Sequence, residues 1–144
     1  MPLVGTFQRP INVDVYASIS DCASAGRLSQ VSCRRYSQSA QEKDPSFAIK
    51  WPDKEACENE ATRRAVCLRR SGQREPFWSA RPVGFLVCLA KNAQCSADVA
   101  APVYEVATIG LITGVGGGAL SRTDRGNPFE WRVGPHIKYP LPII

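Results

Sequence analysis

The sequence has little histidine and no long apolar run. A membrane-spanning helix needs about 18 or more consecutive apolar residues. The longest apolar segments, VGFLVCLA at 83–90 and ATIGLITGVGGGAL at 107–120, are too short or too rich in glycine. The N-terminal segment MPLVGTFQRPINVDVY also lacks a basic region followed by an apolar segment and a small-residue cleavage site. We therefore expect no membrane span and no Sec export signal.

Motifs for catalysis and cofactor binding are also missing. The single histidine, His136, lies between Pro135 and Ile137 and has no evident serine or cysteine partner, so a nucleophilic triad is not indicated. The glycine run at 114–118 lacks the following helix, strand and acidic residue that a dinucleotide-binding loop requires. No C-x-x-C motif of the thioredoxin kind is present. We expect a protein that is not an enzyme and binds no cofactor.

What the sequence does have is six cysteines, separated by ten, twenty-three, nine, twenty and six residues. Zinc sites usually bring two ligands within two to four residues of each other, so these intervals do not indicate a metal site. An even number of cysteines in a short chain is typical of structural disulfides. Free cysteines that act as small buried apolar residues are the alternative. We predict disulfides at Cys22, Cys33, Cys57, Cys67, Cys88 and Cys95.

The disulfide pairing stays open at this stage, because six cysteines allow fifteen connectivities. Antiparallel packing of the predicted helices at 30–44 and 54–67 would favour Cys33 with Cys67, which leaves Cys22 for Cys57. Cys88 and Cys95 flank a candidate hairpin turn and could close it.

The formal net charge is +5, and arginines occur in adjacent pairs at 34–35, 63–64 and 69–70. Arginine suits carboxylates, phosphates and protein interfaces better than lysine does. No aromatic ladder or nucleic-acid-binding motif accompanies the charge, so nucleic acid is an unlikely partner. We interpret the pairs as a solvated basic face, with salt bridges to partner chains as the alternative.

A chain of 144 residues is long enough for one domain with a single core. Alternating apolar residues predict a strand at 10–19, and a helical turn is expected at 20–26. Helices are predicted at 30–44, where Ser29 caps the start and Pro45 forces the end, and at 54–67. A short strand at 46–51, a loop at 71–82 and a hairpin of 83–90 with 102–112 complete the pattern. The fold class is therefore a small α+β domain stapled by disulfides, with two or three short helices and a β-hairpin.

The last residues, 127–144, are interpreted as an extended arm, which leaves 1–126 as the domain. Apolar residues alternate here, but Pro140 and Pro142 exclude a central strand. We expect one apolar side of the arm to contact a partner chain through Phe129, Trp131, Ile137, Tyr139, Leu141 and Ile143.

Several landmarks resemble the YgiB-like family of uncharacterised bacterial envelope proteins. They are the DC pair at 21–22, Cys33, Tyr36, Cys57 and Cys67, then FW...P.GF at 77–85 and PVY at 102–104. The resemblance covers residues 15–105. It implies a lipoprotein or export signal and a family with no established enzymatic activity. The chain departs from this pattern in lacking that signal, in adding Cys88 and Cys95, and in its apolar arm.

Three hypotheses for function follow. The first is a non-enzymatic structural or docking subunit of a larger multi-chain assembly, such as a phage virion or another extracellular assembly. The second is a YgiB-like envelope or periplasmic protein that binds an unknown partner. The third, a thiol-redox protein, is disfavoured because no nucleophile, base and orienting group can be assembled from the residues present.

Overall fold

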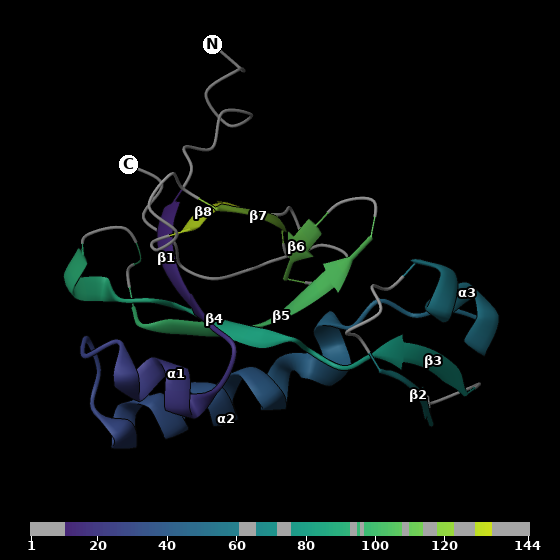
Figure 1. The fold of residues 1–144 in the computed structure, drawn as a ribbon, viewed down its shortest axis with the longest axis horizontal. Helices are drawn as coiled ribbons and strands as arrows, with labels where there is room; N and C mark the ends of the chain where they lie inside the picture. Colours follow the sequence, from purple (N-terminus) through teal and green to yellow (C-terminus); the bar gives the residue numbers. More distant parts are fainter. Residues whose placement is uncertain are drawn as a thin grey trace, which may run out of the picture.

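The described residues include a closed antiparallel β-barrel with helices packed against one side (Figure 1). The computed structural model describes residues 11–60, 66–71, 76–92, 95, 97–107, 110–113, 118–122 and 129–133. In order around the barrel, the strands are β1 (Ile11–Tyr16), β4 (Gly84–Cys88), β5 (Val99–Val106), β6 (Gly110–Ile112), β7 (Gly118–Arg122) and β8 (Phe129–Val133). A short 3-10 helix, η2 (Ala90–Asn92), follows β4.

Strand β1 closes the barrel because it has neighbours on both edges. Its second half pairs with β4, with Tyr16 opposite Phe85, and its first half pairs with β8, with Ile11 opposite Trp131. The first and last described strands of the chain are therefore hydrogen-bonded partners. Closure removes the exposed sheet edges that an open sheet would present.

The barrel interior is filled by alternate residues of the strands, as the two-residue period of a strand requires. Leu86 and Cys88 of β4 point inward, whereas Phe85 and Val87 point outward against the helices. Burial on both faces explains why this strand appears in the sequence as a continuous apolar run. The buried members of the interior cluster are Ile11, Val13, Leu86, Cys88, Cys95, Val99, Ala101, Val103, Leu120 and Phe129.

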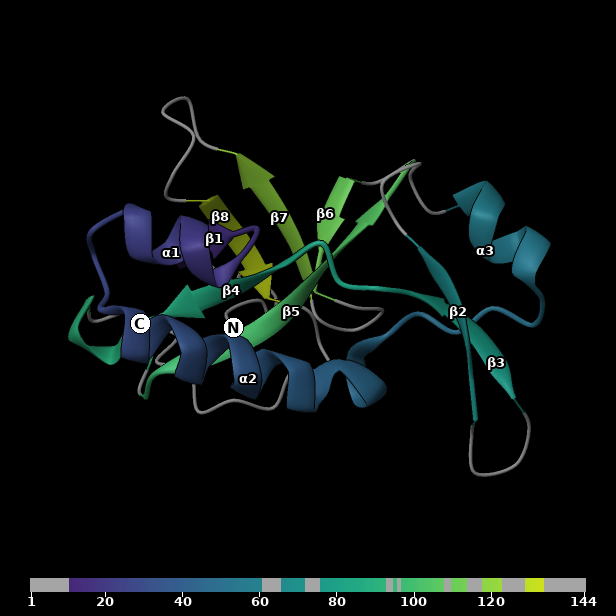
Figure 2. The ribbon, with the colours of Figure 1, turned by 60° about the horizontal axis from the view of Figure 1, so that its bottom comes forward.

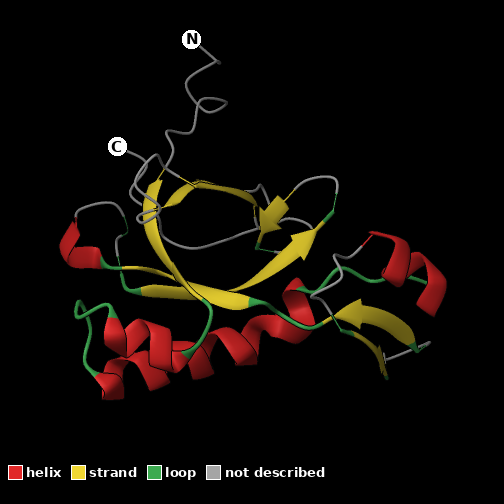
Figure 3. Cartoon of the chain, viewed as in Figure 1, coloured by secondary structure: helices red, strands yellow, loops and turns green. Residues whose placement is uncertain are grey.

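Helices α1 (Ile19–Ser24) and α2 (Gln30–Phe47) cover the outer face of β4 and β5 (Figure 3). Ser18 and Ser29 cap the two helices, since each hydroxyl accepts a hydrogen bond from a backbone N–H three residues later, at 3.1 Å. The face of α2 that carries Tyr36 and Ala40 packs on the barrel. The capping by Ser29 confirms the sequence prediction.

A smaller unit lies beyond the C-terminal end of α2 (Figure 2). It consists of α3 (Lys54–Glu60) and a two-stranded antiparallel sheet of β2 (Cys67–Arg70) and β3 (Phe77–Ala80). Trp51 joins this sheet through a backbone bridge to Trp78. We call residues 51–60 together with β2 and β3 the hairpin unit.

The predicted fold class, a small α+β domain with two or three short helices and a β-hairpin, is wrong. The strands predicted at 10–19, 83–90 and 102–112 do contribute β1, β4 and β5, and β4 pairs with β5 as a hairpin. That hairpin is part of a closed six-stranded barrel, however, and strands dominate the structure. Closure depends on pairing between residues more than a hundred positions apart, which a local sequence pattern does not reveal.

Several predicted element boundaries also need correction. Helix α2 does not end before Pro45 but continues to Phe47, because the Ala48 N–H donates to the Asp44 carbonyl at 2.9 Å. The segment 46–51, predicted as a strand, therefore begins in helix, and its last residue makes an isolated bridge. Helix α3 is described over Lys54–Glu60, and Cys67, predicted as the end of this helix, begins β2 instead. The predicted loop at 71–82 contains β3.

Candidate functional site

A cleft of about 720 Å³ opens between α2 and the hairpin unit. One wall is formed by Ser37, Ala40, Gln41 and Asp44, whose spacing places them on one face of α2. Leu68 and Arg70 of β2 form another wall; residues two apart in a strand share a face. We call this space the α2–β2 cleft. Its volume falls in the range of small-molecule sites.

The base of the cleft is formed where the barrel meets the helices. Ala17 and Ile19 flank the turn from β1 into α1, and Phe85 and Pro102 come from the paired strands β4 and β5. Gly84 lets β4 come close to β1 here, because a Cβ at this position would collide with the Tyr16 carbonyl oxygen. This close approach explains the glycine in the FW...P.GF landmark.

An ion pair with a hydrogen-bonded tyrosine lies in the wall of the cleft. The Arg70 Nη1 atom lies 2.5 Å from Asp44 Oδ2, with 20% of the arginine and 13% of the aspartate side chain exposed. The Tyr104 hydroxyl donates to Asp44 Oδ1. Burial raises the pKa of Tyr104 strongly, and the hydrogen bond to Asp44 and its negative charge add to this shift. Tyr104 therefore stays neutral and serves as a donor to the carboxylate.

Two groups in the cleft still have hydrogen-bonding capacity. The buried Arg70 Nε has no hydrogen-bond partner among the described residues. Arg81 lines the cleft, is exposed, and forms no ion pair with the part of the chain that the structure describes. An unmade hydrogen bond from a buried charged donor is unfavourable, so such a donor calls for a functional explanation. The cleft thus offers cationic donors beside an apolar surface.

All six predicted cysteines form disulfides, which confirms the prediction of structural cross-links. The pairs are Cys22 with Cys33, Cys57 with Cys67, and Cys88 with Cys95. The last pair matches the candidate hairpin closure. The favoured pairing of Cys33 with Cys67 and Cys22 with Cys57 is wrong, because α2 packs on α1 and the barrel instead of on α3.

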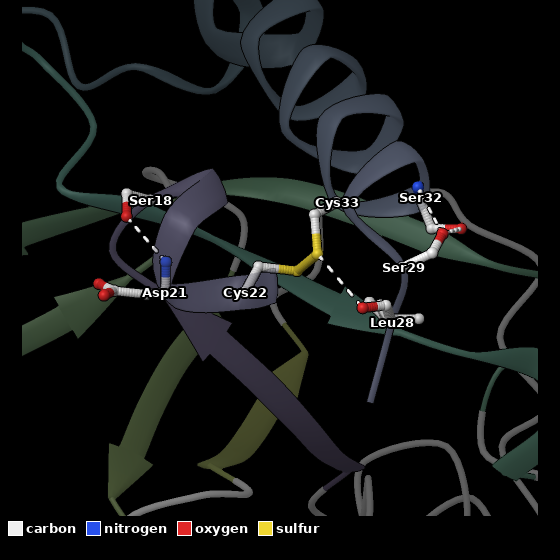
Figure 4. The surroundings of a disulfide bond; sticks show 7 residues. All are labelled: Ser18, Asp21, Cys22, Leu28, Ser29, Ser32 and Cys33. Carbon is white, nitrogen blue, oxygen red and sulfur yellow. Dashed lines mark hydrogen bonds between the residues drawn. A yellow bond between two sulfur atoms is a disulfide. The ribbon is translucent and has the colours of Figure 1, made fainter. Parts of the chain in front are cut away.

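Two of the disulfides hold elements that shape the cleft. The Cys22–Cys33 disulfide ties α1 to the first turn of α2 (Figure 4). Each cysteine follows the serine that caps its own helix, Ser18 for α1 and Ser29 for α2. Cys57–Cys67 ties α3 to β2, directly before Leu68 of the cleft wall. Cys22, Cys33 and Cys57 are fully buried. The cross-links are therefore structural supports of the cleft rather than reactive groups in it.

The predicted partner-binding arm is partly incorporated in the barrel. Phe129–Val133 forms β8, and Phe129 is buried in the barrel interior, so it is not available to a partner. The backbone of Trp131 pairs with β1 and β7. Ile137, Tyr139, Leu141 and Ile143 lie outside the described residues.

The arginine pairs have different environments rather than forming one basic face. Arg70 pairs with a carboxylate of its own chain, and Arg35 packs 5.3 Å from the centre of the Tyr36 ring. Arg34 and Arg69 are exposed, as the solvated-face interpretation expects. Residues 63 and 64 lie outside the described residues.

The residues that line the cleft were not predicted as a site from the sequence. Asp44 and Arg70 are separated by 26 residues, and a local pattern does not show that they meet. The one available signal was the helical spacing of Ser37, Ala40, Gln41 and Asp44, which marks a face with polar and small residues.

Comparison with known proteins gives a family but no described relative. A model of the family "Protein of unknown function (DUF1190)" matches residues 11–127, most of the chain. The chain belongs to this family. DUF1190 is the YgiB-like family, so the resemblance found in the landmarks is confirmed. No curated protein and no solved structure matches.

The described part of the DUF1190 chain lacks two features, a membrane-spanning helix and a metal-binding cluster. No helix in the described ranges is long and apolar enough to cross a membrane. Across the same residues, no group of three or more His, Cys, Asp or Glu side chains is arranged to hold a metal ion.

Proposed function

We propose that this chain is a non-enzymatic binding domain of the bacterial envelope that recognises a partner through the α2–β2 cleft. The observation that carries the proposal is that all six cysteines are engaged in disulfides. Such cross-links persist in oxidising compartments such as the periplasm and are rare in the cytosol. Membership of the DUF1190 family is consistent with this location.

The contacts in the cleft support binding rather than catalysis. Asp44 accepts from both Arg70 and Tyr104, so this carboxylate is committed to an ion pair and is a poor general base. Ser18 also lines the cleft, but its hydroxyl accepts a hydrogen bond from the Asp21 N–H and so serves as a helix cap. A cleft with an apolar base and a few convergent polar groups is typical of a binding site.

The location is tested by expressing the chain in a bacterium with and without a fused export signal. Thiols are trapped by a mass-shifting alkylating reagent at lysis. We expect the exported chain to carry no label and to melt cooperatively, and the cytosolic chain to be labelled and less stable. A cytosolic chain that is fully labelled yet melts at the same temperature would contradict the proposal, since the disulfides would then be dispensable.

The binding surface is tested by a photo-crosslinking residue placed at Gln41, on the cleft wall, in the exported chain. Val31, which is 74% exposed on the same helix but does not line the cleft, is the matched control. We expect a discrete cross-linked product from position 41 and none from position 31. The same product from both positions would exclude the cleft as the recognition site.

The assembly-subunit hypothesis, including a virion location, stays a prediction. It depends on residues 127–144 contacting a neighbour, and Phe129–Val133 belongs to the barrel. A truncation that tests it has to follow Val133, because removal of β8 would open the barrel. Loss of an assembly on deletion of 134–144, with the melting temperature unchanged, would support the hypothesis.

A further inference from the structure

The balance of charge in the α2–β2 cleft indicates what kind of ligand it can hold. Among the residues that the structure describes, three charged side chains line the cleft: Asp44 is negative, and Arg70 and Arg81 are positive. Asp44 is compensated by Arg70 at 2.5 Å. One positive charge, that of Arg81, is therefore left for a ligand. A singly charged anion would complete the balance, whereas a dianionic phosphate would leave a surplus negative charge near Asp44.

The arginine geometry points in the same direction. Guanidinium groups bind carboxylates through paired N–H donors. Arg81 is exposed at the rim, and Arg70 keeps a fifth of its side-chain surface exposed while its Nε has no acceptor among the described residues. The Arg70 Nε is covered and its Nη1 is engaged by Asp44, so Arg81 is the guanidinium that a ligand can reach. A ligand carboxylate can accept two hydrogen bonds from the Arg81 guanidinium alone.

Besides the polar Ser18, Ser37 and Gln41, the described lining of the cleft is apolar. These apolar residues include Leu68, Pro82, Phe85 and Pro102, of which Phe85 and Pro102 are buried. Leu68 and Pro82 are half-buried, so a ligand would remove surface that is still in contact with water. A charged head alone would leave this surface uncovered. The shape therefore favours an anionic head attached to an apolar stem.

We propose that the α2–β2 cleft binds a ligand that presents one carboxylate on a short apolar stem. The inference rests on the proposed function, in which the cleft is the recognition site. Two sources share this chemistry, namely a free carboxylic acid and the C-terminal carboxylate of an apolar peptide. The Arg81 guanidinium holds the carboxylate, and the apolar side chains that line the cleft hold the stem.

The experiment is calorimetric titration of the oxidised full chain with matched probes. Hexanoate is compared with hexanamide, and a peptide ending in a free apolar residue with its C-terminal amide. We expect at least one carboxylate probe to bind at least about tenfold more tightly than its amide, as two charge-assisted hydrogen bonds allow. Which of the two probes binds identifies the source. Inorganic phosphate should not compete with it.

Substitutions test whether the preference for a carboxylate probe over its amide comes from the cleft. Arg81→Gln should reduce the preference for carboxylate over amide to less than about threefold, as expected when one charged donor is lost. Arg69→Gln is the matched control, because Arg69 is an exposed arginine of β2 that does not line the cleft, and it should leave the preference unchanged. Gln41→Trp should reduce binding of both members of a pair by filling the cleft.

Three results would overturn the inference: no saturable binding of either carboxylate, competition by inorganic phosphate at equal concentration, or equal effects of the Arg81 and Arg69 substitutions. Because the titrations use folded, oxidised protein, these failures leave the envelope location intact. That location is contradicted separately, by the thiol-labelling and melting experiment.

Discussion

The barrel and the hairpin unit are stabilised in different ways, although they belong to one chain. The barrel buries ten residues in one interior cluster and a second cluster beneath the helices. The hairpin unit buries Trp51, Cys57 and Ala80, with a few half-buried neighbours, and it has the Cys57–Cys67 disulfide. Burial of apolar area can stabilise the first, but a small cluster needs a cross-link to hold its geometry.

The Asp44–Arg70 ion pair and the Tyr104 hydrogen bond lie where the two regions meet. The cleft is therefore a junction between the barrel, which has large buried clusters, and the hairpin unit, which has a small one. Four predictions test this difference, beginning with the largest expected effect.

Leu86→Ala should destabilise the whole protein most. Leu86 is fully buried in the barrel interior, and removal of such a side chain leaves a cavity that costs about 2 to 5 kcal/mol. Leu68→Ala, at a half-buried position of the hairpin unit, should cost about 1 kcal/mol. Chemical denaturation of both variants gives the two free energies of unfolding. Equal losses would show that the hairpin unit is as tightly packed as the barrel.

The double substitution Cys57→Ala with Cys67→Ala should loosen the hairpin unit and spare the barrel. A cross-link over a loop of this length contributes about 2 to 4 kcal/mol, here mainly to the local structure. Amide hydrogen exchange should accelerate in β2 and β3 but not in β4 and β5. The control is Cys88→Ala with Cys95→Ala, which removes a cross-link from the barrel cluster and should lower the global melting temperature. If the Cys57→Ala, Cys67→Ala variant exchanged its amide hydrogens faster in the barrel strands as well, the hairpin unit would not be stabilised separately from the barrel.

Asp44→Asn should weaken the junction between the two regions. It leaves the largely buried Arg70 without its counter-charge, at a cost of about 2 kcal/mol. Asp14→Asn is the matched control, because its partner Arg27 is 54% exposed and such pairs contribute less than about 1 kcal/mol. Denaturant titration of both variants measures the difference. A larger loss for Asp14→Asn would mean that this junction is not a stabilising contact.

Alkaline pH should destabilise the folded protein through two buried tyrosines of the barrel strands, Tyr16 and Tyr104. Burial, with Asp14 adding to it, raises the pKa of Tyr16 to about 12, and the pKa of Tyr104 is also raised. Both folded pKa values lie above the ordinary value of 10.0. The resulting stability is complete below pH 10 and is lost as the pH rises through 10 toward 12.

Tyrosinate absorbance and circular dichroism, followed against pH, should show two ionisations delayed until unfolding. Tyr16→Phe should move the alkaline unfolding midpoint to higher pH, because the group whose ionisation favours the unfolded chain is gone. A midpoint that stays the same in this variant would exclude Tyr16 as a source of the pH dependence.

The sequence predicted well those features that are set by neighbouring residues. The cap at Ser29, the strands around 11–16 and 84–88, and the short Cys88–Cys95 loop all depend on local pattern. The landmarks also pointed to the correct family.

What the sequence did not predict depends on contacts between distant residues. Phe129–Val133 has the alternation of a strand, but whether it forms an arm or a barrel strand is decided by β1, far away in the chain. Helix α2 was predicted to end before Pro45, but it continues for three more residues to Phe47, beside an Asp44 fixed by Arg70 and Tyr104. The cleft was missed for the same reason, since its walls come from elements that meet only in the folded chain.

The disulfides have one property that bears on how the protein matures. Each cysteine is joined to the next one along the chain, with separations of 11, 10 and 7 residues. A chain that crosses a membrane N-terminus first presents its thiols to an oxidant in that same order, so successive oxidation yields the native pairs without reshuffling. The barrel, in contrast, cannot close before β8 is available, because β8 is the second neighbour of β1.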